Sequence, residues 1–247
     1  MRSQIKIALL IVGNILLILL IVFAMFFALS KLIDRMNTRD ITRKTENFAY
    51  LNRSARQGQT VFIGDSITEF YPLEELFSIY MEQTGQKVYN RGISAEFSDH
   101  LLSRMEDTVL NLQPKILVVL IGTNDIDGKV TAQKTHDNIK ALVEKTQKQS
   151  PGTKIVLQAL YPVNEEMEGF GAKTAVGKRT NEAIRDLNTK LKSLAEEKDI
   201  VYLDLTDVLS DSGGNLNELY TYDGIHPNIE GYSVITREIE KELMKLQ

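Results

Sequence analysis

The stretch from Thr60 to Phe70 reads TVFIGDSITEF, and the rest of the chain is organised around it. Its first four residues, Thr60 to Ile63, are β-branched or aromatic, which is typical of a buried strand. Gly64-Asp65-Ser66 ends that strand, and a helical pattern begins near Pro72. Ligands of open α/β sheets bind just beyond the carboxyl ends of the strands, which is where Ser66 falls. Its hydroxyl is a candidate nucleophile if the chain also supplies a base, an orienting acid and an oxyanion site.

Strand-like and helix-like segments alternate after residue 59. Short apolar runs predict strands at 60–63, 88–90, 115–121, 154–160 and 200–203. Helical spacing of apolar residues predicts helices at 73–84, 98–112, 131–149, 177–198 and 229–246. This alternation predicts an α/β fold, a three-layer αβα sandwich around a five-stranded parallel sheet. The segment 164–176 does not fit the rhythm, and it is either a lid over the site or a mobile surface insertion.

The composition indicates a globular protein and argues against nucleic-acid-binding and metal-binding classes. Of 247 residues, 43% are hydrophobic and 25% are charged, which is ordinary for a globular chain. The first 50 residues carry seven Lys/Arg against three Asp/Glu, so the remainder holds a net charge of −8 within a total of −4. A catalytic part this acidic is a poor candidate for nucleic-acid binding. The chain has no Cys and shows no metal-ligand cluster, so we expect neither a metal nor another cofactor.

The N-terminal region is expected to be a membrane anchor. After a short tail at 1–6, the segment 7–29 runs for 23 residues without a charge, which makes about 34 Å of helix and is enough to span a bilayer core. A cleaved signal peptide is the alternative, but the segment is long for one, and bulky Phe26 lies three residues before a cut after Ala28. Residues 30–58 are polar and predict a juxtamembrane stalk, which leaves 59–247 as the globular domain.

The orientation of that anchor is ambiguous from charge. Two basic residues precede the span and five follow it, so a literal count would place the C-terminal side in the cytoplasm. Large domains, however, are translocated largely regardless of charge. We therefore expect an extracytoplasmic domain on a single-pass membrane protein.

Polar or small residues follow several predicted strands. Together with the last loop they include every group that acyl transfer requires: a nucleophile, a base, an acid and oxyanion donors. Ser66 follows the first strand, and His226 in the last loop can accept its proton. Asp223, three residues before His226, can fix the imidazole tautomer and stabilise its cation. The oxyanion would be bound by the backbone N–H groups of Ser66 and Gly92 and by the side-chain amide of Asn124. Because the carboxyl ends of parallel strands share one edge of a sheet, we expect these groups to converge there.

Four sequence blocks carry a resemblance to a known family. They read Gly64-Asp65-Ser66, Asn90-Arg91-Gly92-Ile93-Ser94, Gly122-Thr123-Asn124-Asp125 and Asp223-Gly224-Ile225-His226-Pro227. In this order they resemble the SGNH/GDSL hydrolases, a family of serine esterases and lipases, and within it the platelet-activating-factor acetylhydrolase-like branch. The resemblance covers about residues 59–246 and implies a flavodoxin-like sheet.

The same resemblance implies catalytic roles for Ser66, Asp223 and His226, and oxyanion roles for Ser66, Gly92 and Asn124. The chain departs from the family at Ala95, where many relatives continue Gly-x-Ser-Gly. Each block alone is a weak signal, since Gly-Asp-Ser is common in turns, and it is the joint occurrence of four blocks that points to catalysis.

The sequence therefore predicts a membrane-anchored serine esterase acting on a lipid-type or short-acyl ester. One alternative is an O-acetyl esterase of cell-envelope polysaccharide, and another is a non-catalytic, membrane-tethered binding module. Neither the acyl-chain length nor the oligomeric state follows from the sequence. Two interpretations of Arg91 stay open: it contacts an anionic substrate, or it forms a surface ion pair.

Overall fold

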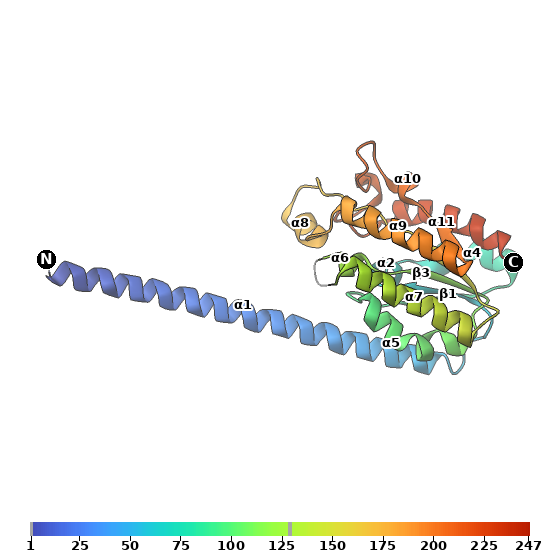
Figure 1. Cartoon of the computed structure of the whole chain (residues 1–247), viewed down its shortest axis with the longest axis horizontal. Helices are drawn as coiled ribbons and strands as arrows, with labels where there is room; N and C mark the ends of the chain where they lie inside the picture. The colour runs from blue at the N-terminus through green and yellow to red at the C-terminus, as the bar shows by residue number, and fades with distance from the viewer. Residues whose placement is uncertain (1, 128–129) are drawn as a thin grey trace. The chain divides into compact units, whose positions relative to one another are not determined.

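The computed structural model describes residues 2–127 and 130–247 (Figure 1). Contacts divide the chain into two compact units, Met1–Arg43 and Lys44–Gln247. The N-terminal helix α1 covers Arg2–Leu51, so its last turns belong to the second unit. The sequence predicts a globular part from residue 59, whereas the compact unit begins fifteen residues earlier. The difference arises because the end of α1 packs on the strand that carries Arg91, through contacts described below.

Helix α1 has the composition of a membrane span. The part of this helix that belongs to the first unit exposes large apolar side chains, such as Ile11, Leu16 and Phe23. One stretch of the helix is long and apolar enough to cross a bilayer, with a mean hydropathy of 3.1. An N-terminal signal sequence meets the same criteria of length and composition.

The second unit is built on the predicted five-stranded parallel sheet. Its strands are β1 (Thr60–Gly64), β2 (Val88–Gly92), β3 (Ile116–Leu120), β4 (Lys154–Gln158) and β5 (Val201–Leu203), in the order β2-β1-β3-β4-β5. Every residue of β1 and β3 is buried, because helices cover both faces of the sheet. The strand order reverses at β1, so the crevice at its carboxyl end is the expected ligand position.

Helices fill the connections and cover the two faces. They are α2 (Ser66–Glu69), α3 (Leu73–Leu76), α4 (Ser78–Thr84), α5 (Ser98–Thr108), α6 (Thr123–Ile126), α7 (Ala132–Gln149), α8 (Phe170–Val176), α9 (Asn181–Lys198), α10 (Thr206–Leu209) and α11 (Ile229–Lys245), with 3₁₀ turns at Leu110–Leu112 and Glu218–Tyr220. Helices α5, α7 and α9 lie side by side on one face (Figure 1), as right-handed crossovers between parallel strands would place them. On the other face α11 packs against α2, where the Tyr232 hydroxyl donates to the Ile67 carbonyl at 2.8 Å.

Several element boundaries differ from the prediction. The segment 73–84 forms two helices interrupted at Phe77, and 98–112 ends in a 3₁₀ turn after Thr108. Helix α9 begins at Asn181 instead of residue 177, because the Thr180 hydroxyl caps it by accepting the Ala183 N–H. The segment 164–176, predicted to be a loop, contains the short helix α8.

Candidate active site

A tight turn from β1 into α2 positions Ser66 at the carboxyl edge of the sheet. Gly64 is required at this turn, because a Cβ atom there would lie 2.2 Å from the Leu120 carbonyl oxygen. Asp65 caps α2 by accepting the Ile67 N–H at 3.0 Å. Ser66 is the first residue of α2 and is partly exposed, so its hydroxyl is accessible beside the sheet edge.

A hydrogen-bonded chain joins Ser66 to His226, 160 positions away in the sequence, and through it to Asp223. Ser66 Oγ lies 2.9 Å from His226 Nε2, and His226 Nδ1 lies 2.8 Å from Asp223 Oδ2. The Thr221 hydroxyl donates to the His226 carbonyl at 2.8 Å and closes the loop. The three residues that the sequence nominated as nucleophile, base and acid are therefore joined in one hydrogen-bonded chain through His226.

The charge state of Asp223 sets the roles of the two imidazole nitrogens. Partial burial works to raise the pKa of Asp223, but hydrogen bonds from the His226 ring and backbone outweigh it and hold the pKa below its ordinary value. Asp223 is then a carboxylate and can only accept, so Nδ1 of His226 carries the proton that it shares with Asp223. Nε2 is left as the acceptor that faces the Ser66 hydroxyl, which is the arrangement a general base requires.

Two of the predicted oxyanion donors keep an N–H without an acceptor among the described residues. The Ser66 N–H is at the first position of a helix, where a backbone amide has no intrahelical partner. Asn124 lies on α6 after β3, and its Oδ1 accepts a hydrogen bond from Arg179 Nη2 at 2.8 Å, which fixes the direction of the amide. Its Nδ2 donates one hydrogen to the Glu96 carbonyl at 3.0 Å and keeps a second hydrogen for another acceptor.

The third predicted donor, Gly92, is used differently. Its N–H donates to Asn90 Oδ1 at 2.9 Å, within the same loop. A Cβ atom at Gly92 would lie 2.3 Å from the Glu69 backbone nitrogen, so glycine is needed there for close packing against α2. These contacts argue against the predicted oxyanion role of Gly92 and give the residue a packing role instead.

Ala95 is a further candidate oxyanion donor that the sequence reasoning did not nominate. It has a left-handed backbone with φ +60°, a conformation that favours glycine. Among the residues that the structure describes, its N–H has no hydrogen-bond acceptor. The available signal was the departure from Gly-x-Ser-Gly at this position, since a backbone with φ +60° favours glycine.

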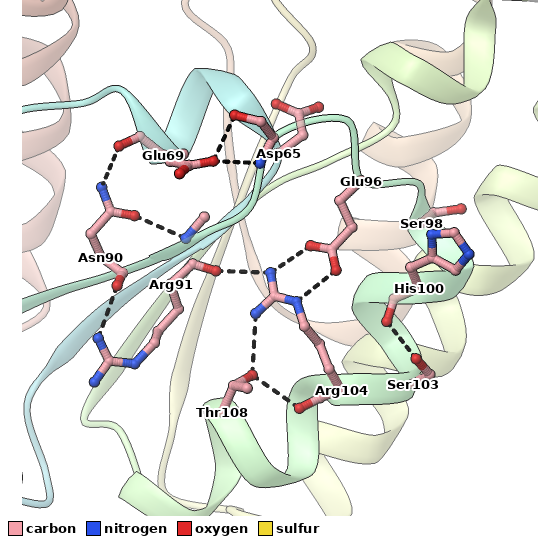
Figure 2. A network of polar contacts seen from close by, with 12 residues as sticks. Asp65, Glu69, Asn90, Arg91, Glu96, Ser98, His100, Ser103, Arg104 and Thr108 are labelled. Carbon is pink, nitrogen blue, oxygen red and sulfur yellow. Dashed lines mark hydrogen bonds and ion pairs between the residues drawn. The ribbon is translucent and has the colours of Figure 1, made fainter. Parts of the chain in front are cut away.

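The loop between β2 and α5, which contains Ala95, is held from both sides by the carboxylates of Glu69 and Glu96. Figure 2 shows both side chains. On one side Glu69 Oε2 accepts both the N–H and the hydroxyl of Ser94, each at 2.6 Å. On the other side the buried carboxylate of Glu96 accepts from Arg104 Nε at 2.7 Å and from Nη2 at 2.5 Å. Arg104 also donates to the Arg91 carbonyl, so the ion pair ties the loop to the end of β2.

Three other polar residues have structural roles. Arg91 is not a surface ion pair and does not contact the proposed site. Its guanidinium is buried over the rings of Phe48 and Tyr89, with centroid distances of 4.9 and 5.2 Å. Asp65 and Asp125 accept hydrogen bonds from the backbone N–H groups of Ile67 and Ser98. Within the described ranges, no group of three or more His, Asp or Glu side chains is arranged to hold a metal ion.

Comparison with known proteins agrees with this fold. The model of the GDSL-like Lipase/Acylhydrolase family matches residues 62–234, so the chain belongs to that family. The chain is a carboxylic ester hydrolase of the GDSL esterase and lipase class.

Individual relatives are distant in sequence. The chain is 29% identical over 180 residues to the N-acylneuraminate cytidylyltransferase of Escherichia coli O18:K1:H7, covering 72% of this chain but only 38% of that protein's length. It is 27% identical over 192 residues to the bovine platelet-activating factor acetylhydrolase IB subunit alpha1, covering 77% of each. A solved Streptococcus pneumonia structure, described as a candidate platelet activating factor, is 30% identical with a TM-score of 0.79 and covers 86% of this chain and 97% of its own.

Proposed function

We propose that the chain is a membrane-anchored serine esterase that works through an acyl-enzyme intermediate. Ser66 is the nucleophile, His226 the general base and acid, and Asp223 the orienting carboxylate. The observation that carries the proposal is the continuous chain of hydrogen bonds from Ser66 through His226 to Asp223. A serine hydroxyl is a weak nucleophile at neutral pH, and this chain supplies the base that it needs.

The reaction follows from these roles. As Ser66 Oγ bonds to the ester carbonyl carbon, its proton moves to His226 Nε2, and Asp223 stabilises the imidazolium that forms. The tetrahedral oxyanion is bound by the Ser66 N–H, the second N–H of Asn124 Nδ2 and the N–H of Ala95. His226 returns the proton to the leaving alcohol, which departs. Water, deprotonated by the same nitrogen, then hydrolyses the acyl-enzyme and releases the acid.

The surroundings of His226 favour an ester with an apolar part. The ring of Phe70 is 55% exposed, and its centroid lies 5.4 Å from that of the imidazole. Leu219 and Tyr222, on the loop that leads to His226, are also exposed. Exposed apolar side chains beside a catalytic base offer contact to an acyl chain or lipid. We propose a lipid-type or short-acyl ester, held near a membrane by residues 7–29 with the catalytic domain outside the cytoplasm.

The test is hydrolysis of nitrophenyl esters by the full chain in detergent, with acetyl, butyryl and long-chain acyl groups. Ser66→Ala is expected to reduce turnover by about 10⁶-fold, and a fluorophosphonate probe should label the wild type but not the variant. Ser103→Ala is the matched control, because this exposed hydroxyl only donates to the carbonyl of His100. Wild-type rates in Ser66→Ala would refute the assignment of the nucleophile. A sharp preference for acetyl esters would instead favour a polysaccharide O-acetyl esterase.

A further inference from the structure

Glu69 links the nucleophile-bearing helix to the loop of Ala95. It is the last residue of α2, the short helix that begins at Ser66. One carboxylate oxygen accepts the N–H and the hydroxyl of Ser94, the residue directly before Ala95. The other oxygen accepts a hydrogen bond from Lys44 Nζ at 2.5 Å. A single side chain therefore joins Ser66's helix, the Ser94–Ala95 turn and Lys44.

This turn needs support from outside itself. A non-glycine residue at φ +60° is strained by about 1–2 kcal/mol, and such backbone persists only where its surroundings hold it. Hydrogen bonds to an ionised acceptor are stronger than neutral ones. Partial burial works to raise the pKa of Glu69, but the hydrogen bonds from Lys44 and Ser94 outweigh it and lower the pKa, so the acceptor is charged at neutral pH. Glu69 is thus suited to fix the turn.

Lys44 is itself held in place by the last turns of α1. Within the second unit, Phe48 lies under the buried guanidinium of Arg91, and Arg91 Nη2 donates to Asn52 Oδ1 at 2.8 Å. Lys44 and Phe48 are four residues apart on one side of α1. Asn52 follows the last residue of the helix and continues this side, because its N–H donates to the Phe48 carbonyl at 2.9 Å. The side chains of Lys44 and Glu69 are only 22% and 25% exposed, which limits solvent screening of their ion pair.

We propose that Glu69 is a positioning residue for the esterase reaction, and that Lys44 at the end of the N-terminal helix secures it. Glu69 sets the position of the Ala95 N–H relative to Ser66, so the helix that precedes the hydrolase domain supplies part of the active-site scaffold. The role rests on the proposed function, because it acts through the oxyanion donors. Neither residue touches the substrate, so the effect should fall on kcat and leave KM nearly unchanged.

The experiment compares variants of the full chain in detergent. Lys44→Met removes the cation and keeps the length of the side chain, and Lys44→Arg retains the charge. Lys198→Met is the matched control, because Lys198 is 18% exposed and pairs with Glu144 at 2.6 Å away from the site. Glu69→Gln keeps the shape of the side chain and removes its charge. The readouts are kcat and KM for a nitrophenyl ester, and the hydrogen exchange of the Ser94 amide.

The expected results separate positioning from general stability. Glu69→Gln should lose about 10–100-fold in kcat, and Lys44→Met about 3–10-fold, with KM changed by less than about 2-fold in both. Lys44→Arg should restore most of the lost turnover, and Lys198→Met should behave as the wild type. The Ser94 amide should exchange faster in Lys44→Met and Glu69→Gln than in the control. In Glu69→Gln, the further change Lys44→Met should cost less than it does alone, because the two residues form one unit.

Equal kcat and equal Ser94 exchange in Lys44→Met and Lys198→Met would overturn the positioning role, even if the enzyme is active. A wild type that neither hydrolyses esters nor reacts with a fluorophosphonate would overturn the proposed function, and the positioning role would fall with it. Ser94 exchange keeps the two failures apart, because it reports the contact of Glu69 with the turn without requiring turnover.

Discussion

Asp223 holds His226 through both of its carboxylate oxygens. Oδ2 lies 2.8 Å from the ring nitrogen Nδ1, and Oδ1 accepts the His226 backbone N–H at 2.9 Å. The second contact fixes the main chain of the loop, while the first fixes the ring. One side chain therefore fixes both the ring and the backbone of His226. This explains how an acid only three residues before the base can orient the imidazole toward Ser66.

Asp223→Asn should separate the charge of this carboxylate from its shape. The amide can still accept the backbone N–H, so the loop should fold, but the ring loses its anionic partner and can adopt the wrong tautomer. We expect kcat to fall by about 10⁴-fold with little change in KM, as in other serine triads. Steady-state kinetics on a short-chain nitrophenyl ester measure this. Turnover within a few-fold of the wild type would show that Asp223 does not serve His226.

Gly92→Ala tests whether this glycine is needed for packing. The added methyl group would lie 2.3 Å from the Glu69 nitrogen and 2.7 Å from the Thr68 carbonyl carbon, which are backbone atoms that cannot move aside cheaply. We expect a loss of about 1–3 kcal/mol or more in the free energy of unfolding, measured by denaturant titration. Gly152→Ala is the control, since a Cβ atom there meets nothing within 4 Å. Equal stability of the two variants would contradict the packing role.

Ala95→Gly should stabilise the chain, unlike most alanine-to-glycine changes. Glycine relieves the strain at φ +60° and keeps the N–H, although it adds entropy to the unfolded state, so the net gain should be about 0.5–1 kcal/mol. Ester hydrolysis should be retained. Asp199→Gly, at φ +51° away from the site, should gain similarly, because its exposed side chain makes no hydrogen bond to the residues that the structure describes. Ala95→Val should lose stability, and a stable, fully active Val variant would count against the left-handed turn.

The buried carboxyl group of Asp65 is expected to make the free energy of unfolding fall as the pH rises, which is opposite to the usual effect of a carboxylate. Burial raises the pKa of Asp65 to about 7, against the opposing effects of the Ile67 N–H and the charges of His226 and Arg179. The folded-state pKa is then above the unfolded value of about 3.9, so the folded chain binds more protons between these limits. The contribution of Asp65 is present at low pH and is lost as the pH rises from about 4 to about 7.

Asp65→Asn keeps the acceptor for the Ile67 N–H and removes this titration. Relative to the wild type, the variant should become more stable as the pH rises from 5 to 8, by about 3 kcal/mol. Urea titrations at several pH values measure the difference. Asp204→Asn is matched, because Asp204 makes the same contact to the N–H two residues on, but in an exposed position. A parallel pH dependence of both variants would refute the prediction.

The sequence predicts best those elements that depend on residues close together along the chain. The strands 60–63 and 115–121 were predictable because continuous β-branched runs have few alternatives to a buried strand. The helix at 73–84 was predicted as one piece because periodicity alone does not show the break at Phe77. The start of α9 depended on one hydroxyl at Thr180, a local capping signal that was overlooked.

The sequence by itself determined the order of the elements and nominated Ser66, Asp223 and His226, because residue type and position after a strand restrict the chemistry so strongly. Tertiary structure alone decided which amides are free to bind an oxyanion. The Gly92 N–H is taken by Asn90, and Ala95 adopts a left-handed turn that Glu69 and Glu96 brace from either side. Whether a backbone amide is available depends on neighbours that only folding brings together, and no pattern of residue types records this. The position of Lys44 also depends on folding. The sequence predicts that it lies in a stalk, whereas the structure shows it in an ion pair with Glu69, beside the Ser94–Ala95 turn.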